Sequence, residues 1–438
     1  MSGRARRATV LLALAAAAGF AFGASSASAA PGDLDPSFGR NGVVSTPIGS
    51  EARALALQQN GRIIAVGNLG EYGYTIEIDR FFRDGDIDPT FGNGGRVNVV
   101  DAGDGYVYAA AAGIDSQGRI VVAGTLAEYD APRRIVVARV LPGGDLDTSY
   151  GDQGIVLLEP GSEVVARLEI RPDDSILVGG TVNRPRQNPA LIVAQIDNQG
   201  ELDSSYGDGG MAVVPLGNRG GVAAMDVDAQ GRATLAEGWP GADRSIDVIR
   251  LTAGGELDDS FSGDGRRGLD LGRKEWIRTV AIGKRGRIFV GGSVAEREPR
   301  HTYRTNLALA RLKSGDSLDR RFGRRGIVTT DTDRFDYASS LEPQADGKIV
   351  VSAIGDRFSL GYPQEWAVLR YGQRGKLDDS FSGNGRAHPE LYGSPPAMEM
   401  QPDGRILLLG WRWEDDADTD PYGFTLARLR NDGRPLGG

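Results

Sequence analysis

A nine-residue motif that recurs seven times constrains this chain more than any other feature of its sequence. The motif reads Leu/Ile-Asp-x-x-aromatic-Gly/Ser-x-x-Gly, and successive copies lie 53, 59, 56, 55, 61 and 59 residues apart. The copies begin at Leu34, Ile87, Leu146, Leu202, Leu257, Leu318 and Leu377. This period is much longer than one coil of a β-solenoid, so each repeat must contain several short elements of its own.

Each period contains the same succession of four short strands. A strand such as 43–46 follows the closing glycine, and a strand of small residues such as 54–57 comes next. An Asn-Gly or Asp-Gly turn, as at 59–61, supplies the positive φ that a tight hairpin needs. A nearly continuous apolar strand (63–66) and an alternating strand (307–312 in a later copy) complete the period. Four short strands are the content of one propeller blade.

The two ends of the repeat region predict how the blades are joined. The region opens with a lone strand at 43–46 and ends with three strands, at 397–401, 405–409 and 424–430. Pairing the first strand with the last three would complete a seventh blade and leave no unpaired sheet edge. A linear array would need capping repeats, and the sequence has none. We therefore predict an all-β fold, a seven-bladed β-propeller whose N-terminal strand closes the last blade.

Residues 1–29 have the features of a secretory signal peptide. Three arginines lie among the first seven residues, 10–23 is an apolar and small-residue run, and 27–29 reads Ala-Ser-Ala. We predict cleavage after this segment, a secreted, extracellular product and a single propeller domain over 30–438. The Arg6-Arg7 pair leaves open export by the general or the twin-arginine route.

Composition excludes several classes of function. The chain has no cysteine, which excludes disulfides, thiol nucleophiles and cysteine-ligated zinc. Its formal charge is −9, and loss of the three signal-peptide arginines lowers this to −12, so nucleic acid is not an expected partner. No second apolar span follows the signal peptide. We expect a monomer with no membrane span after signal removal.

The repeats resemble the bacterial delta-60 repeat family. The resemblance is carried by the Leu-Asp-x-x-Phe-Gly-x-x-Gly turn and the Asp-Gly-Lys/Arg-Ile hairpin, and it covers essentially the whole chain after residue 29. Ser262 and Ser382 replace the first glycine of the turn, and Asp174-Ser175 replaces Asp-Gly in the third blade. The resemblance implies an exported bacterial protein with propeller-like architecture, and it implies no activity and no binding residues.

A polar residue that recurs in every blade has a structural task that recurs with it. The motif aspartates are expected to cap backbone amides of their own turns. Arginine recurs near the end of the third strand of the blade, with Gln195 as the exception. We predict that these arginines bind the turn aspartates. The alternative is a calcium ion at each turn, since Asp33-x-Asp35 and its counterparts present alternate carboxylates.

A specific binding site is expected on the face that carries the connections between the second and third strands, because these differ in every blade. Aromatic side chains in and beside these connections are the candidate ligand contacts: Trp411, Trp413, Trp239, Trp366, Tyr72, Tyr129 and Tyr362. The catalytic residues, if the protein is an enzyme, are not apparent from the sequence.

Calcium is the one cofactor for which the sequence offers a candidate site. Asp416, Asp418 and Asp420 match the opening spacing of a calcium-binding loop. Pro421 stands where such a loop has glycine, and Ala427 stands where it has its bidentate glutamate. An acidic loop exposed to solvent is the alternative, and otherwise no cofactor is expected.

The sequence favours a binding module over an enzyme. His301 and His388 lie two blades apart, which argues against a shared catalytic triad. The preferred function is therefore an extracellular binding or interaction module for a glycan or a surface protein. One alternative is a carboxylate-based hydrolase or lyase of extracellular polysaccharide, using acidic residues such as Glu163, Glu275 and Asp336 near the inner strands. The other is a structural envelope protein without a small ligand.

Overall fold

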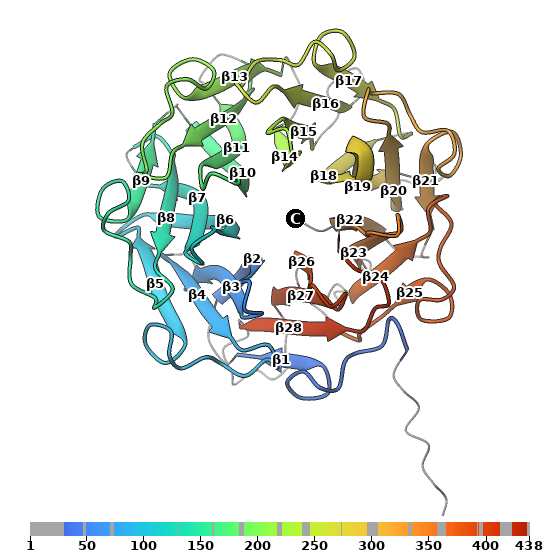
Figure 1. Ribbon diagram of the computed structural model, residues 1–438, viewed down its shortest axis with the longest axis horizontal. Coiled ribbons are helices and arrows are strands. Elements are labelled where there is room, and N and C mark those ends of the chain that lie inside the picture. The colour runs from blue at the N-terminus through green and yellow to red at the C-terminus, as the bar shows by residue number, and fades with distance from the viewer. Residues whose placement is uncertain are drawn as a thin grey trace, which may run out of the picture.

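The computed structural model describes most of the chain after residue 29. The described residues are 30–46, 50–70, 74–129, 131–159, 162–183, 188–216, 221–238, 246–272, 274–295, 305–331, 335–356, 365–391, 393, 397–411 and 423–435. Within these ranges the chain forms seven four-stranded antiparallel sheets, which are arranged as a ring about a central axis (Figure 1). The fold is the predicted seven-bladed β-propeller.

Blades are numbered here by the order of their inner strands. Blade 1 contains β2 (Ser50–Leu57), β3 (Ile63–Leu69), β4 (Thr75–Phe81) and β5 (Arg96–Asp101); blade 2 contains β6 (Tyr106–Ile114), β7 (Ile120–Ala127), β8 (Arg134–Val140) and β9 (Ile155–Leu158). Blade 3 contains β10 (Ser162–Ile170), β11 (Ile176–Asn183), β12 (Ala190–Ile196) and β13 (Met211–Pro215); blade 4 contains β14 (Val222–Val227), β15 (Ala233–Glu237), β16 (Ile246–Leu251) and β17 (Arg266–Leu269).

The remaining blades follow the same order. Blade 5 contains β18 (Glu275–Gly283), β19 (Arg287–Ala295), β20 (Thr305–Leu312) and β21 (Ile327–Thr330), with a short 3-10 turn, η1 (Lys284–Gly286), between its first two strands. Blade 6 contains β22 (Phe335–Pro343), β23 (Ile349–Asp356), β24 (Glu365–Tyr371) and β25 (Arg386–Ala387). Blade 7 contains β26 (Ala397–Met400), β27 (Ile406–Trp411), β28 (Phe424–Leu429) and β1 (Val43–Ser45).

Blade 7 closes the ring as the sequence predicts. Strand β1 pairs antiparallel with β28, with Val43 opposite Ala427 and Ser45 opposite Thr425. Beside this pairing, the Arg428 amide donates to the Gly42 carbonyl oxygen at 2.9 Å. The outer edge of the last sheet is therefore covered by the start of the described chain.

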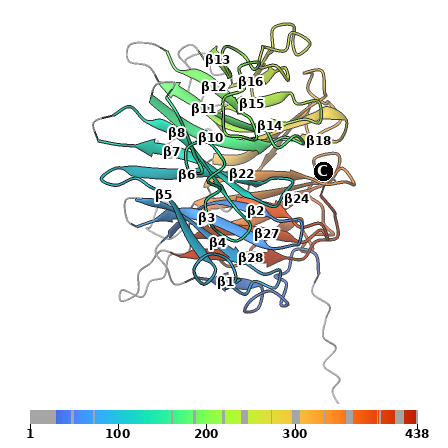
Figure 2. The ribbon, with the colours of Figure 1, turned by 60° about the vertical axis from the view of Figure 1, so that its left-hand side comes forward.

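The hydrophobic core consists of layers between neighbouring blades. Seven clusters of buried residues each combine two adjacent blades, and the cluster of blades 7 and 1 includes Leu407, Leu426, Leu55 and Ile63. Adjacent sheets pack face to face, as the oblique view shows for blades 1, 2 and 3 (Figure 2). Strands such as β7 are buried on both faces because each blade is covered on both sides.

The repeated motif joins each blade to the next. In blade 1, Arg80 donates from Nε to Asp88 Oδ2 at 2.8 Å, and its guanidinium lies 4.5 Å from the centre of the Phe91 ring. The Arg80 Nη1 also donates to the carbonyl oxygen of Pro142 in blade 2. Arg139, Arg250, Arg311 and Arg428 bond to the corresponding carbonyl oxygen of the following blade, with Arg428 reaching blade 1. The predicted arginine–aspartate pairs are confirmed, and they form a ring of inter-blade contacts.

Blade 3 keeps this contact despite its glutamine. Gln195 donates to Asp203 Oδ2 at 2.7 Å, and Arg171 donates to Gln195 Oε1 at 2.6 Å. Arg171 Nη2 then donates to the carbonyl oxygen of Ala253 in blade 4 at 3.2 Å, and its guanidinium lies 5.8 Å from the centre of the Tyr206 ring. A second residue from another strand end thus replaces the missing guanidinium.

The inner strands share a distortion that shapes the channel. In blades 1 to 6 the pairing of the first and second strands shifts by one residue at the same place, as between Ala52 and Ala54 in blade 1. A β-bulge of this kind bends a strand and redirects its side chains.

Candidate functional site

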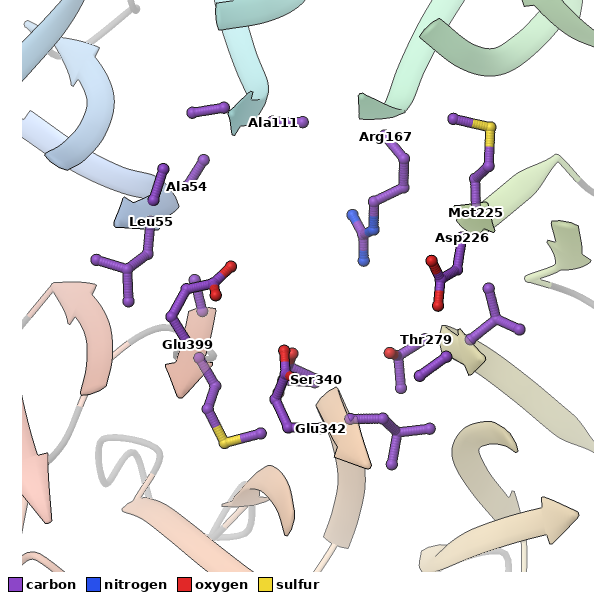
Figure 3. A pocket seen from close by; sticks show the side chains of 18 of the residues that line it. Ala54, Leu55, Ala111, Arg167, Met225, Asp226, Thr279, Ser340, Glu342 and Glu399 are labelled. Carbon is purple, nitrogen blue, oxygen red and sulfur yellow. The ribbon is translucent and has the colours of Figure 1, made fainter. Parts of the chain in front are cut away.

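The channel at the centre of the ring is lined by all seven inner strands. Its volume is about 1350 Å³, and its wall includes Arg167, Asp226, Glu342 and Glu399, whose side chains extend toward the open centre (Figure 3). On the face that carries the turn motifs, Pro435 lines the channel and pairs with Gln344 of blade 6. We call this face the motif face and the opposite one the variable face.

Four carboxyl groups of the channel occupy one position of the repeat. Glu169, Asp226, Glu342 and Glu399 each pair with the second residue of the neighbouring strand, as Glu399 pairs with Leu407. The other three blades have Ala56, Gly113 and Ala281 at this position. Because the position repeats around the axis, the four acidic side chains converge in one cavity.

Burial raises the pKa values of all four carboxyl groups. It raises the pKa of Glu399 to about 7 and that of Asp226 to about 6, and it places the pKa of Glu342 well above its ordinary value. Burial, followed by the charges of Asp226 and Glu399, does the same for Glu169. Asp226 also accepts bonds from the amides of Val227 and Ile282, which hold its carboxylate between blades 4 and 5.

A cluster of tyrosines lies on the variable face, between blades 1 and 2. Tyr106 and Tyr108 lie on one side of β6, while Val107 between them is buried, as strand alternation requires. Tyr74 precedes β4, and Tyr129 follows β7. Tyr129, Tyr74 and Tyr108 are 71%, 44% and 42% exposed, so three large rings face solvent together.

Tyr106 is the centre of this tyrosine cluster. Its ring centre lies 5.4 Å from that of Tyr129, edge to face, and 6.4 Å from that of Tyr108, nearly parallel. The two hydroxyl groups of Tyr106 and Tyr129 are hydrogen bonded, and this bond raises the pKa of Tyr106 to about 12. Arg134 and Glu128 form an ion pair of 2.6 Å beside the cluster. The result is an aromatic surface with a charged rim.

The structure places the predicted ligand contacts in different settings. Tyr129 is exposed within the tyrosine cluster. Trp366, in contrast, is fully buried between blades 6 and 7, where its ring packs against Gly410, so its predicted role in ligand contact is corrected to one in the core. The backbone of Trp411 ends β27, but its side chain lies outside the described residues. Seven further predicted residues lie entirely outside the described ranges: Trp239, Trp413, Tyr72, Tyr362, Asp416, Asp418 and Asp420.

The acidic residues singled out from the sequence are not those that line the channel. Glu275 is buried and accepts bonds from the amides of Leu271 and Gly272 at 2.6 and 2.9 Å, and burial raises its pKa to about 7. It shapes a loop and is absent from the channel lining. The side chains of Glu163 and Asp336 lie outside the described residues.

Sequence reasoning missed the four channel carboxyl groups and three of the four clustered tyrosines. The carboxyl groups share one signal, an acidic residue two positions before the hairpin turn in four of seven repeats.

The motif aspartates are bonded within the protein, as the sequence predicts. Asp88 accepts hydrogen bonds from Arg80 and Arg62 on one carboxylate oxygen and from Thr90 on the other.

Within the described ranges, no group of three or more histidine, aspartate or glutamate side chains is arranged to hold a metal ion. No helix of the described chain is long and apolar enough to cross a bilayer.

Comparison with known proteins supports the fold and its repeats. Residues 58–91, 116–150, 171–206 and 344–381 match a family described as a domain of unknown function, DUF5122, with β-propeller fold. No curated protein sequence matches the chain.

Solved structures resemble it at low identity. The polysaccharide lyase Uly1 is 8% identical, with 92% of each chain covered and a TM-score of 0.51. A fungal alcohol oxidase of the AA5 family in complex with copper is 13% identical over 92% of this chain and 76% of that one, with a TM-score of 0.48. YCF48 bound to D1 peptide is 10% identical over 89% and 96%, with a TM-score of 0.47. The likeness to Uly1 shows the propeller fold alone, and on this fold the chain carries repeats similar to the DUF5122 family.

Proposed function

We propose that the protein is an exported propeller that binds extracellular polysaccharide through its tyrosine cluster. The observation that carries the proposal is the exposure of three neighbouring tyrosine rings at one place on the variable face. The pyranose rings of sugars have an apolar C–H face that stacks on aromatic rings, and their hydroxyl groups bond to tyrosine hydroxyls and to charged groups at the rim.

The surroundings of the cluster support a binding surface over a packing defect. Among the described residues, seven large apolar side chains are exposed, and three of the seven are these tyrosines. Contiguous exposed apolar groups with a polar rim are typical of binding sites. Tyr74 is also held in place by its backbone, since its amide donates to Leu69 and its carbonyl oxygen accepts from Ala102. These bonds fix the backbone from which the Tyr74 ring extends.

Binding of neutral polysaccharides to single-site variants tests the proposal. Laminarin, xylan and chitohexaose are titrated against the protein by calorimetry, alongside Y129A, Y106A and the control V213A. Val213 is 42% exposed, but it lies on β13 of blade 3. We expect a loss of affinity of about tenfold for each tyrosine variant, which corresponds to about 1.4 kcal/mol. Equal affinities for the variants and the control would refute the proposal.

A second candidate function is carboxylate-based cleavage of a polysaccharide in the channel. It is favoured by the four convergent carboxyl groups, because a carboxyl group with a pKa near 7 is suited to act as a general acid. The test is the release of reducing ends from the same polysaccharides, and of unsaturated products from polygalacturonate, by the wild type and by E399Q and E342Q. Product formation that both substitutions leave unchanged would exclude these residues.

A further inference from the structure

The motif face carries a hollow between blades 5 and 6 whose charge is opposite to that of the whole chain. Its volume is about 1110 Å³. Six exposed basic side chains line it: Lys284, Arg285, Lys313, Arg320, Arg321 and Arg374. We call this hollow the basic pocket. The formal charge of the whole chain is −9, so the pocket is a local reversal of sign.

The acidic groups beside the basic pocket form no ion pair with these six cations among the described residues, and Lys284 Nζ donates instead to the carbonyl oxygen of Ala345. Asp319 is bound at 2.9 Å by Arg311 and lies 3.9 Å from Arg287, and Asp346 lies 3.7 Å from Lys348. Asp316 belongs to the same turn as Lys313. Among the described residues, the ion pairs of the protein include none of the six.

Five of these basic residues occupy positions at which the other six repeats have no basic residue. Arg321 stands where the other six blades have serine or threonine, such as Ser260, which bonds to its turn aspartate. Arg285 stands where the other hairpins have asparagine, glutamine or aspartate, and it adopts a positive φ of 62°. The positions of Lys284, Arg320 and Arg374 are also basic in this one place only.

Departures from a repeat carry information when they gather at one place. A residue that the fold itself requires recurs in all seven blades, as the motif aspartate does. The five basic residues come from three separate turns of two blades, yet they line one hollow. Like charges in close proximity destabilise the folded protein, and a non-glycine residue at positive φ adds about 1 kcal/mol or more to that cost.

We propose that the basic pocket binds the acidic groups of an anionic polysaccharide. Guanidinium groups bind carboxylate, sulfate and phosphate oxygens through paired hydrogen bonds, and Arg285, Arg320, Arg321 and Arg374 supply four of them. Nucleic acid fits less well, since single-strand sites add aromatic rings for base stacking and no aromatic residue lines this pocket. This site lies on the face opposite the tyrosine cluster and does not depend on it.

Repeat-restoring substitutions give a sharp test, because the introduced residues are those that other blades carry at the same positions. The variant R285N/R320S/R321S is compared with R133S, whose arginine is exposed on the connection between β7 and β8. Binding to polygalacturonate, dextran sulfate, neutral dextran and a short single-stranded DNA is measured by biolayer interferometry over a range of salt concentrations.

We expect polygalacturonate or dextran sulfate to bind the wild type, with affinity that falls as salt rises. Neutral dextran has no acidic group, so its behaviour should be the same in the wild type and the triple variant. The triple variant should lose at least tenfold in affinity for the acidic polymer that binds, while R133S stays within twofold of the wild type. A preference between the two acidic polymers identifies carboxylate or sulfate as the recognised group. Unchanged binding in the triple variant, absence of binding to both acidic polymers, or tighter binding to DNA would overturn the proposal. A melting temperature close to that of the wild type confirms that the variant is folded.

Discussion

Single residues of the repeated motif each make several contacts, and the arginine of the third strand is the clearest case. Arg250 bonds to Asp258 at 2.7 Å, to Ser260 at 3.0 Å and to the carbonyl oxygen of Ser314 in the next blade at 2.8 Å. Its guanidinium also lies 4.6 Å from the centre of the Phe261 ring. Removing one partner of such a buried ion pair leaves an uncompensated charge, which costs about 3–5 kcal/mol.

Blade 3 offers a direct test of this contact. We expect R171M to lower the melting temperature by several degrees, since it removes the bonds to Gln195 and Ala253. The substitution Q195R restores the arginine that the third strands of the other six blades carry. The double variant R171M/Q195R should therefore recover much of the loss. Thermal unfolding of the wild type, both single variants and the double variant measures this coupling. Additive effects of the two substitutions would contradict the compensation.

Among the elements, the inner strands differ most from one another in chemistry while sharing one geometry. The residue two positions before the hairpin is Glu or Asp in four blades and Ala or Gly in three. Burial of these carboxyl groups favours their protonated forms. The motif aspartates behave in the opposite way. Burial would raise the pKa of Asp378, but bonds from Lys348 and Ser380 and the charge of Arg370 lower it to about 2.

These opposite shifts predict a maximum of stability in mildly acidic solution. Asp378 contributes stability that is present above pH 4 and is lost as pH falls through about 2. Glu399, with its raised pKa, contributes stability that is present below about pH 4.5 and is lost as pH rises through about 7. Since Glu399 is partly exposed, we expect E399Q to raise stability at pH 8 by about 1–2 kcal/mol and to change little at pH 4.

Melting temperatures measured from pH 2 to pH 9 check this expectation. The wild type should show a decline on both sides of the maximum, E399Q a weaker decline on the alkaline side, and D378N a weaker decline on the acidic side. An alkaline limb that is equally steep in E399Q and the wild type would show that this carboxyl group is ionised at little cost in the folded protein.

At the scale of elements, the sequence was sufficient for the blades but not for the site. The motif, the hairpin turns and the apolar strands repeat, so strand order and the seven turns followed from periodicity. The sequence predicts Trp366 to be a ligand contact because it stands beside a variable connection, but its burial depends on the neighbouring blade, which no local pattern reports. Tyr106 and Tyr74 are 32 residues apart, and only the packing of blades 1 and 2 brings them together.

For the whole molecule, closure depends on one short strand. We expect deletion of residues 30–47 to lower the stability by about 3–6 kcal/mol, because it removes β1 and exposes apolar groups of β28. Leu426, which faces Val44 across this pairing, is fully buried in the intact protein. Thermal unfolding of this deletion is compared with that of a chain starting at residue 30. An unchanged midpoint would mean that blade 7 does not need its outer strand.

The pairing of β1 with β28 also determines when the protein can finish folding. Val43 and Ala427 are partners separated by 384 residues, which is nearly the full length of the described chain. Contacts this distant in sequence form late, because the entropy of bringing the two segments together must be overcome first. During synthesis the N-terminal strand is made first and has to wait for almost everything that follows. Until then the chain is an incomplete ring, and the apolar sheet faces of its first and last blades are exposed. The protein aggregates most easily at this stage, so a chaperone that covers one of these faces would act on it then.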